Sequence, residues 1–143
     1  MSTQRSEQQP KIVAVGFAER GGRGVAYAVG GSGGRGPAVR VGFTCRPLPA
    51  LLGRDVAYAA LEAVAAEFLK RGVMRVVFRI DDDRLPRDLA ERRTMPNALI
   101  LPYLRLRCAL NRFAHAVVEP AAGNVARDAS ARARADVWLN VAA

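Results

Sequence analysis

Five acidic residues stand where a mixed α/β sheet would gather them at one end: Glu19, Asp81, Asp82, Asp83 and Asp128. Glu19 follows the first apolar run, the three aspartates follow a β-branched run, and Asp128 lies early in the last helical segment. Such sheets bind ligands beyond the carboxyl ends of their parallel strands. Because carboxylate oxygens suit magnesium and manganese, convergent acids at that end are typical of metal-assisted phosphoryl transfer.

The elements that must position these acids begin with three short strands. Apolar or alternating runs occupy 11–18, 24–29 and 38–45, and glycine-rich segments separate them at 19–23 and 30–36. Short loops of this kind favour hairpins, so the three runs are predicted to form an antiparallel meander.

Helices and strands alternate in the rest of the chain. Apolar residues recur at helical spacing over 54–71, and a β-branched strand follows at 75–80. This order implies a right-handed crossover into parallel pairing. The remaining predicted elements are a short helix at 86–93, a helix at 99–113, a strand at 115–119 and a helix at 124–137. The apolar side of the helix at 99–113 is expected to comprise Leu101, Leu104 and Cys108, with Phe113 as a further candidate. The sequence therefore predicts an α/β fold, in which a three-stranded antiparallel meander and two parallel strands form one five-stranded mixed sheet flanked by helices.

Composition predicts one folded domain with a polyanionic partner. The chain has 143 residues, half of them hydrophobic, which suits a polar tail at 1–10 and a single domain at 11–143. Basic residues outnumber acidic residues by 22 to 13, which gives a formal net charge of +9. All but two of the basic residues are arginine. Arginine suits phosphate contacts, but a GC-rich genome also enriches it, so the arginine excess alone is only partial support for a nucleic-acid partner.

The sequence also argues against several classes of protein. Residues 1–10 lack the apolar core of a signal peptide, and no apolar run approaches the roughly 20 residues that span a bilayer. Cys45, Cys108 and the single histidine, His115, cannot complete a structural zinc site, which takes about four such ligands. We therefore expect reduced, buried thiols in a cytoplasmic protein that does not bind membranes.

Four stretches, in their order and spacing, resemble the ribonuclease H-like superfamily, in its ribonuclease H and reverse-transcriptase-like branch. They are AYAALEAVAAEFLKRG at 57–72, VMRVVFRIDD at 73–82, PNALILPYLRLRCALNRF at 96–113 and NVARDASARA at 124–133. The first is similar to the family's helix after the third strand, and the second to its strand ending in Asp-Ser. The third is similar to the segment before its fifth strand, and the fourth to its closing N-x-x-A-D-x-L-A motif. The likeness covers nearly the whole chain from residue 11 onward.

This resemblance implies a damaged active site. The family cleaves the RNA strand of RNA–DNA hybrids with four carboxylates and two divalent metals, and its third and fourth acids correspond to Asp81 and Asp128. Its second acid falls on Ala57, and its first, an aspartate followed by glycine, falls near Gly16 in the tripeptide Val15-Gly16-Phe17. Two metals about 3.5–4 Å apart need that first acid to offset their repulsion. Because one lost electrostatic stabiliser costs on the order of 100- to 1,000-fold in rate, two losses predict little activity.

The other acids near this end have simpler alternative roles. Asp55 and Glu62 lie near position 57 but on other faces of the helix. Glu19 and Asp82 are weak substitutes, and Glu19 lies three residues past Gly16 with the opposite pleat parity. The aspartates at 81–83 also suit a solvated turn that caps a helix, and Asp128 suits an acid near a helix N-terminus.

Phosphate contacts are expected from arginines around the same end of the sheet. They are Arg20 and Arg23 in the first loop, with Arg54, Arg84 and Arg87 as neighbours. The aromatic residues of the helical segments, Tyr58, Tyr103 and Trp138, are expected to pack in the interior.

Three functions remain in competition. The leading hypothesis is a domain that binds an RNA–DNA hybrid or structured RNA and has lost, or nearly lost, metal-dependent hydrolysis. The second is an active hybrid endoribonuclease that uses Asp81, Asp128, a relocated carboxylate and Mg or Mn, without a nucleotide cofactor. The third is a protein-interaction scaffold that retains only the fold.

Overall fold

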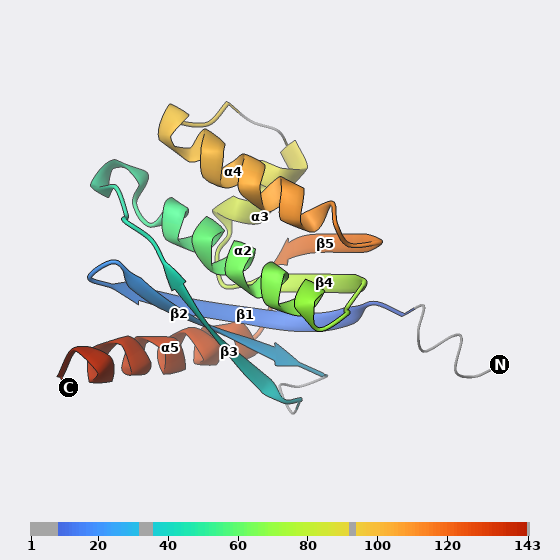
Figure 1. Ribbon diagram of the computed structural model, residues 1–143, viewed down its shortest axis with the longest axis horizontal. Helices are drawn as coiled ribbons and strands as arrows, with labels where there is room; N and C mark the ends of the chain where they lie inside the picture. The colour runs from blue at the N-terminus through green and yellow to red at the C-terminus, as the bar shows by residue number, and fades with distance from the viewer. Residues whose placement is uncertain (1–8, 32–35, 92–93, 143) are drawn as a thin grey trace.

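A five-stranded mixed sheet forms the centre of the computed structural model, which describes residues 9–31, 36–91 and 94–142 (Figure 1). The strand order is β3-β2-β1-β4-β5, with an antiparallel meander at one side and parallel β1–β4 and β4–β5 pairs at the other. The strands are β1 (Lys11–Arg20), β2 (Arg23–Gly30), β3 (Ala38–Thr44), β4 (Arg75–Ile80) and β5 (His115–Pro120). This is the predicted sheet. Most of the predicted tail, the middle of the loop at 30–36 and the predicted helix end at 92–93 lie outside the described residues.

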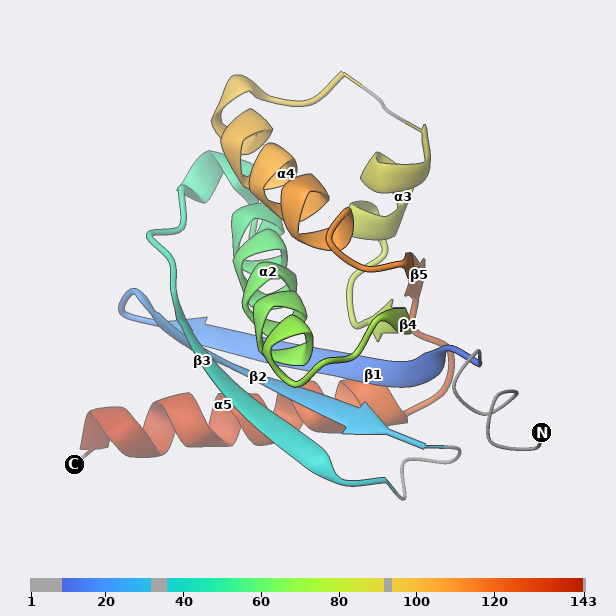
Figure 2. The same cartoon turned by 45° about the vertical axis from the view of Figure 1, so that its right-hand side comes forward.

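Helices cover both faces of the sheet. Within the described residues they are α2 (Arg54–Lys70), α3 (Arg84–Glu91), α4 (Asn97–Leu110) and α5 (Val125–Ala142), with a 3-10 turn, η2 (Pro49–Leu51), before α2. Figure 1 and Figure 2 place α2 on one face with α4 on its outer side, and α5 alone on the opposite face. No helix in the described part of the chain is long and apolar enough to cross a membrane.

The main core lies between the sheet and α2. Val13 and Val15 of β1 and Phe78 of β4 are buried against the apolar stripe of α2 that the helical spacing predicted. The Phe78 ring lies 5.8 Å from that of Phe68 and 6.0 Å from that of Phe113, between centroids. Aromatic pairs at this separation add roughly 0.5–1.5 kcal/mol each beyond the area that they bury.

The predicted apolar side of α4 was wrong within the helix itself, although Phe113, three residues beyond its end, is buried as expected. Leu101 and Leu104 are 55% and 50% exposed, and Cys108 is also exposed. The buried residues of the helix are Leu99, Leu106 and Leu110. Because α4 carries leucines around most of its circumference, the spacing within the helix does not decide which stripe is inside. Packing against α2 decides it.

Small residues allow α5 to lie very close to β1. The buried stripe of α5 includes Ala126, Ala129, Ser130 and Ala133. A Cβ atom added at Gly16 would lie 2.2 Å from the Ser130 backbone nitrogen and 2.4 Å from the Ala126 carbonyl oxygen. This close approach lets the Ser130 hydroxyl accept a hydrogen bond of 3.0 Å from the backbone N–H of Phe17. The side chain therefore satisfies a backbone donor of β1 beyond the end of the β4 ladder.

Candidate functional site at the carboxyl ends of β1 and β4

Asp81 lies directly beside the middle of β1. Val15 is in register with Ile80, the last residue of β4, and the backbone N–H of Asp81 donates to the Val15 carbonyl oxygen at 2.9 Å. The Asp81 side chain is exposed. The β-branched run that ends at Ile80 therefore positions this acid at the carboxyl end of the parallel strands, as predicted.

The first acid of the family, expected near Gly16, would have to stand at Val15 to lie beside Asp81. Gly16 faces α5, where the helix backbone leaves no room for a side chain. Val15 faces the opposite way and shares the main core with Ala57, and both side chains are 0% exposed. In an Asp-Gly pair placed here, the glycine matches Gly16 and the aspartate matches Val15. Both positions where the resemblance implies missing acids are thus filled by apolar side chains of one buried cluster.

Asp128 lies in the first turn of α5 with its side chain exposed. Its backbone N–H donates to the Asn124 carbonyl oxygen at 2.8 Å. No group of three or more His, Cys, Asp or Glu residues in the described segments could hold a metal ion. Two divalent metals need more oxygen ligands than Asp81 and Asp128 provide, so the residues present do not fit a two-metal centre.

Glu19 does not replace a missing acid. Its side chain lies on the same face of β1 as that of Val15, because the two residues are an even number apart. The expectation that Glu19 lies on the wrong face applied only to position 16. However, it is four residues further along the strand, which is about 13 Å at 3.3 Å per residue. Its Oε2 accepts the backbone N–H of Gly22 at 3.0 Å and so holds the β1–β2 turn.

The carboxylates of Asp82 and Asp55 accept hydrogen bonds from backbone N–H groups. The Asp82 Oδ2 accepts the N–H groups of Arg84 and Leu85 at 3.1 and 2.8 Å, so this residue caps α3. The two carboxylate oxygens of Asp55 accept the N–H groups of Leu48 at 2.7 Å and Val56 at 3.1 Å. Asp82 and Asp55 therefore stabilise the first turns of α3 and α2. For Asp82, this is the helix-capping role that the sequence offered as an alternative to metal binding.

Arg54, one of the arginines expected to contact phosphate, has an internal partner. Its guanidinium donates to Asp88 at 2.8 Å, and the side chains are only 23% and 8% exposed. The Tyr58 hydroxyl donates to the same Asp88 oxygen at 2.9 Å. Burial, together with this bond, raises the pKa of Tyr58 well above its usual value. The Arg54–Asp88–Tyr58 cluster therefore joins α2 to α3.

The other predicted arginines fall into two separate groups. Arg84 lies beside the candidate site, where it donates to the Leu52 carbonyl at 3.1 Å and pairs with Asp82 at 3.2 Å, and Arg87 is exposed one turn further along α3. Arg20 and Arg23 lie opposite each other at the β1–β2 turn. Arg20 is five residues beyond Val15, which is about 16 Å along the strand, and it lies on the α5 face.

The cysteines are less buried than expected. Cys108 is exposed on α4, and Cys45, at the end of β3, is half-buried. Burial and the nearby carboxylates of Asp55 and Glu19 raise the pKa of Cys45 to about 11. The group is therefore a neutral thiol at physiological pH and a poor nucleophile or metal ligand.

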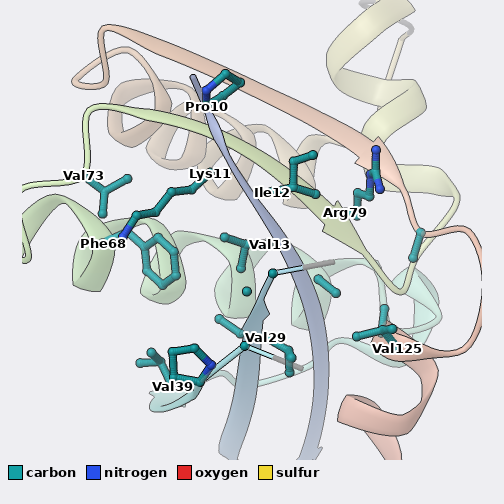
Figure 3. Close-up of a pocket in the computed structure, with 18 of the residues that line it drawn as sticks. Pro10, Lys11, Ile12, Val13, Val29, Val39, Phe68, Val73, Arg79 and Val125 are labelled. Atoms are coloured by element: carbon teal, nitrogen blue, oxygen red, sulfur yellow. The ribbon is translucent and has the colours of Figure 1, made fainter. Parts of the chain in front are cut away.

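A separate apolar hollow of about 990 Å³ lies at the amino-terminal end of β1 (Figure 3). The side chains labelled around it include Val13, Val29, Val39, Phe68 and Val73, with Lys11 and Arg79. None of its lining residues in the described segments is acidic. It lies at the opposite end of β1 from the turn that carries Arg20, and it lacks the ligands that a metal would need.

Comparison of sequences alone assigns no relative, because no family model and no curated protein matches the chain. Comparison of structures gives a clear result. RNase H1 from the halophilic archaeon Halobacterium salinarum superposes with a TM-score of 0.69 at 20% identity, over 90% of this chain and 98% of that one. The chain has the ribonuclease H-like fold.

Two further ribonuclease H structures support the same fold. The N-terminal RNase H domain of a Mycobacterium tuberculosis protein has a TM-score of 0.57 at 14% identity, over 90% of this chain and 98% of that one. LC11-RNase H1, isolated from compost and solved in complex with an RNA/DNA hybrid, has a TM-score of 0.57 at 14% identity, over 87% of this chain and 91% of that one.

Proposed function

We propose that this ribonuclease H-like chain binds nucleic acid, as an RNA–DNA hybrid or structured RNA, and has lost or nearly lost metal-dependent hydrolysis. The observation that carries the second half is the burial of Val15 and Ala57 in one apolar cluster beside Asp81. A valine and an alanine offer no oxygen to a metal. Asp81 and Asp128 retain at most a weak Mg or Mn site.

Charge and shape support the binding half of the proposal. The chain has a formal charge of +9, and a protein of the same fold has been solved with an RNA/DNA hybrid. Arg84 and Arg87 lie on α3, which begins three residues after Asp81, and the backbone of a hybrid would pass over the carboxyl ends of β1 and β4 near this helix. Arginine contacts to phosphates position a duplex without reading its sequence, so little sequence preference is expected.

Replacing Arg84 and Arg87 with alanine is expected to weaken hybrid binding and its dependence on salt. With roughly three to five phosphate contacts, the log–log slope of affinity against salt should lie near −3 to −5, and each lost contact should flatten it by about 1. The measurement is a salt titration of fluorescence anisotropy with a hybrid, a duplex RNA and a duplex DNA.

Arg71→Ala is the matched control, because Arg71 is an exposed arginine directly after α2 that pairs with Glu67 at the far end of the helix. Its slope should equal that of the wild type. Undetectable binding to all three duplexes at low salt would overturn the proposal and favour a protein-interaction scaffold.

A further inference from the structure

Trp138 is exposed on α5, whereas the sequence predicted that it would pack inside. Its side chain is 57% exposed. The Arg20 guanidinium carbon lies 3.4 Å from the centroid of the indole ring. Because Arg20 covers one face of the ring, the exposed area belongs largely to the other face and the edge. A flat aromatic surface backed by an arginine is thus open to a ligand.

A basic hollow lies beside this residue, on the α5 face of the meander. It has a volume of about 1030 Å³, and Arg20, Arg23 and Arg40 line it together with Val137 of α5. A Cβ atom added at Gly42, which also lines the hollow, would meet nothing within 4 Å. Part of the hollow is therefore open down to the backbone of β3.

The positive charge of this hollow is not neutralised within the described residues. Arg40 pairs with Asp136 at 3.1 Å, and the Tyr27 hydroxyl donates to the same carboxylate. These two bonds hold the pKa of Asp136 below its usual range. This acid is therefore ionised, and its charge is paired with Arg40 rather than with Arg20 or Arg23. Arg20 and Arg23 pair with no acid in the described segments. Two uncompensated guanidinium groups therefore lie next to an exposed indole.

We propose that Trp138, Arg20 and Arg23 form a contact site for single-stranded nucleic acid, in which the indole stacks on an unpaired base and the two arginines bind the adjoining phosphates. Single strands are commonly bound in this way, by an aromatic platform within a positive groove. A duplex keeps its bases stacked inside, so it has no base face to offer the ring. An acidic peptide would satisfy the arginines but would leave the indole without a stacking partner.

The site is distinct from the one that binds a duplex in the proposed function. Arg20 is about 16 Å along β1 from the residue that touches Asp81, and it points to the α5 face. The inference rests on the proposed function only in taking the polyanion to be a nucleic acid. A hybrid with an unpaired overhang could occupy both sites at once.

Trp138 is the single tryptophan of the chain, so its fluorescence reports on the site directly. We expect a 12-nucleotide oligothymidylate to quench it in a saturable manner, and an abasic strand of equal length to bind more weakly without quenching. Trp138→Ala should weaken binding of the oligothymidylate by about 10-fold or more, followed by anisotropy of a labelled strand. Arg20→Ala with Arg23→Ala should flatten the salt slope by about 1.4.

Leu139→Ala is the matched control, because Leu139 is the neighbour of Trp138 and is 68% exposed. This replacement should leave the affinity for the oligothymidylate unchanged. Thermal melts check that Trp138→Ala remains folded, as expected for an exposed residue. Equal affinity for the abasic strand or for polyglutamate, absence of quenching, or unchanged affinity in Trp138→Ala would each overturn the proposal.

Parallel titrations of the blunt hybrid separate this proposal from the proposed function. Hybrid binding that depends on Arg84 and Arg87, without binding of the single strand, would refute the α5 site alone. Quenching by the single strand, without hybrid binding, would support the α5 site and refute the duplex site.

Discussion

Replacing Asp88 with alanine is expected to lower the free energy of unfolding by about 3 kcal/mol. Asp88, whose side chain is 8% exposed, accepts hydrogen bonds from Arg54 and Tyr58. Breaking a buried pair leaves the partner charge uncompensated, which costs roughly 3–5 kcal/mol. Because Arg54 is partly exposed, the expected loss for Asp88→Ala lies at the lower end of this range. Urea denaturation followed by circular dichroism measures the change.

Glu67→Ala is the control for Asp88→Ala. Glu67 forms an exposed ion pair with Arg71 one turn along α2, and such pairs contribute about 0.3–0.5 kcal/mol. If Asp88→Ala were no more destabilising than Glu67→Ala, the Arg54–Asp88–Tyr58 cluster would not hold α2 to α3.

Gly16→Ala is expected to destabilise the protein by about 3 kcal/mol. The added methyl group would lie 2.2 Å from the backbone of Ser130, so α5 must move away from β1. Overpacking typically costs about 1–3 kcal/mol, and here the obstacle is backbone rather than a flexible side chain. The same movement would break the hydrogen bond from Phe17 to Ser130.

Gly42→Ala tests whether that loss is specific to the helix contact. Gly42 is also a strand glycine, but a Cβ atom there has open space. Its replacement by alanine should therefore stabilise the protein by about 0.5–1 kcal/mol, because the unfolded chain loses conformational freedom. Equal stability of the two variants would mean that α5 does not press on Gly16. The assignment of the family's first acid to Val15 would then lose its physical basis.

The sequence of helices and strands, and the mixed sheet that they form, could be predicted because each element carries its own local signal. The β-branched run at 75–80 has no competing helical spacing, and a crossover helix between two strands has one favoured hand. The location of Asp81 follows from that run alone. The precise position of the missing acid could not be predicted, because it depends on which face of β1 meets α5. A shift of one residue moves a side chain to the other face.

The inner face of α4 and the exposure of Trp138 depend on tertiary packing. Leu101 and Leu106 are equally apolar, and only contact with α2 selects the second for the interior. Trp138 lies on a helix whose buried side is made of small residues. A large ring is thereby excluded from the contact with the sheet and left at the surface beside Arg20. The pairing of Arg54 with Asp88 could likewise not be predicted from the sequence, because the two residues lie 34 positions apart in the chain.

Incubation of an end-labelled RNA–DNA hybrid with the purified protein, in magnesium and then in manganese, tests the central claim most directly. Anisotropy first establishes that the hybrid is bound, and a denaturing gel then follows the RNA strand. We predict that the bound hybrid stays intact, at the level of a protein-free control, because Val15 and Ala57 present no carboxylate beside Asp81. Metal-dependent cleavage that disappears in Asp81→Asn would contradict this account and identify an active nuclease.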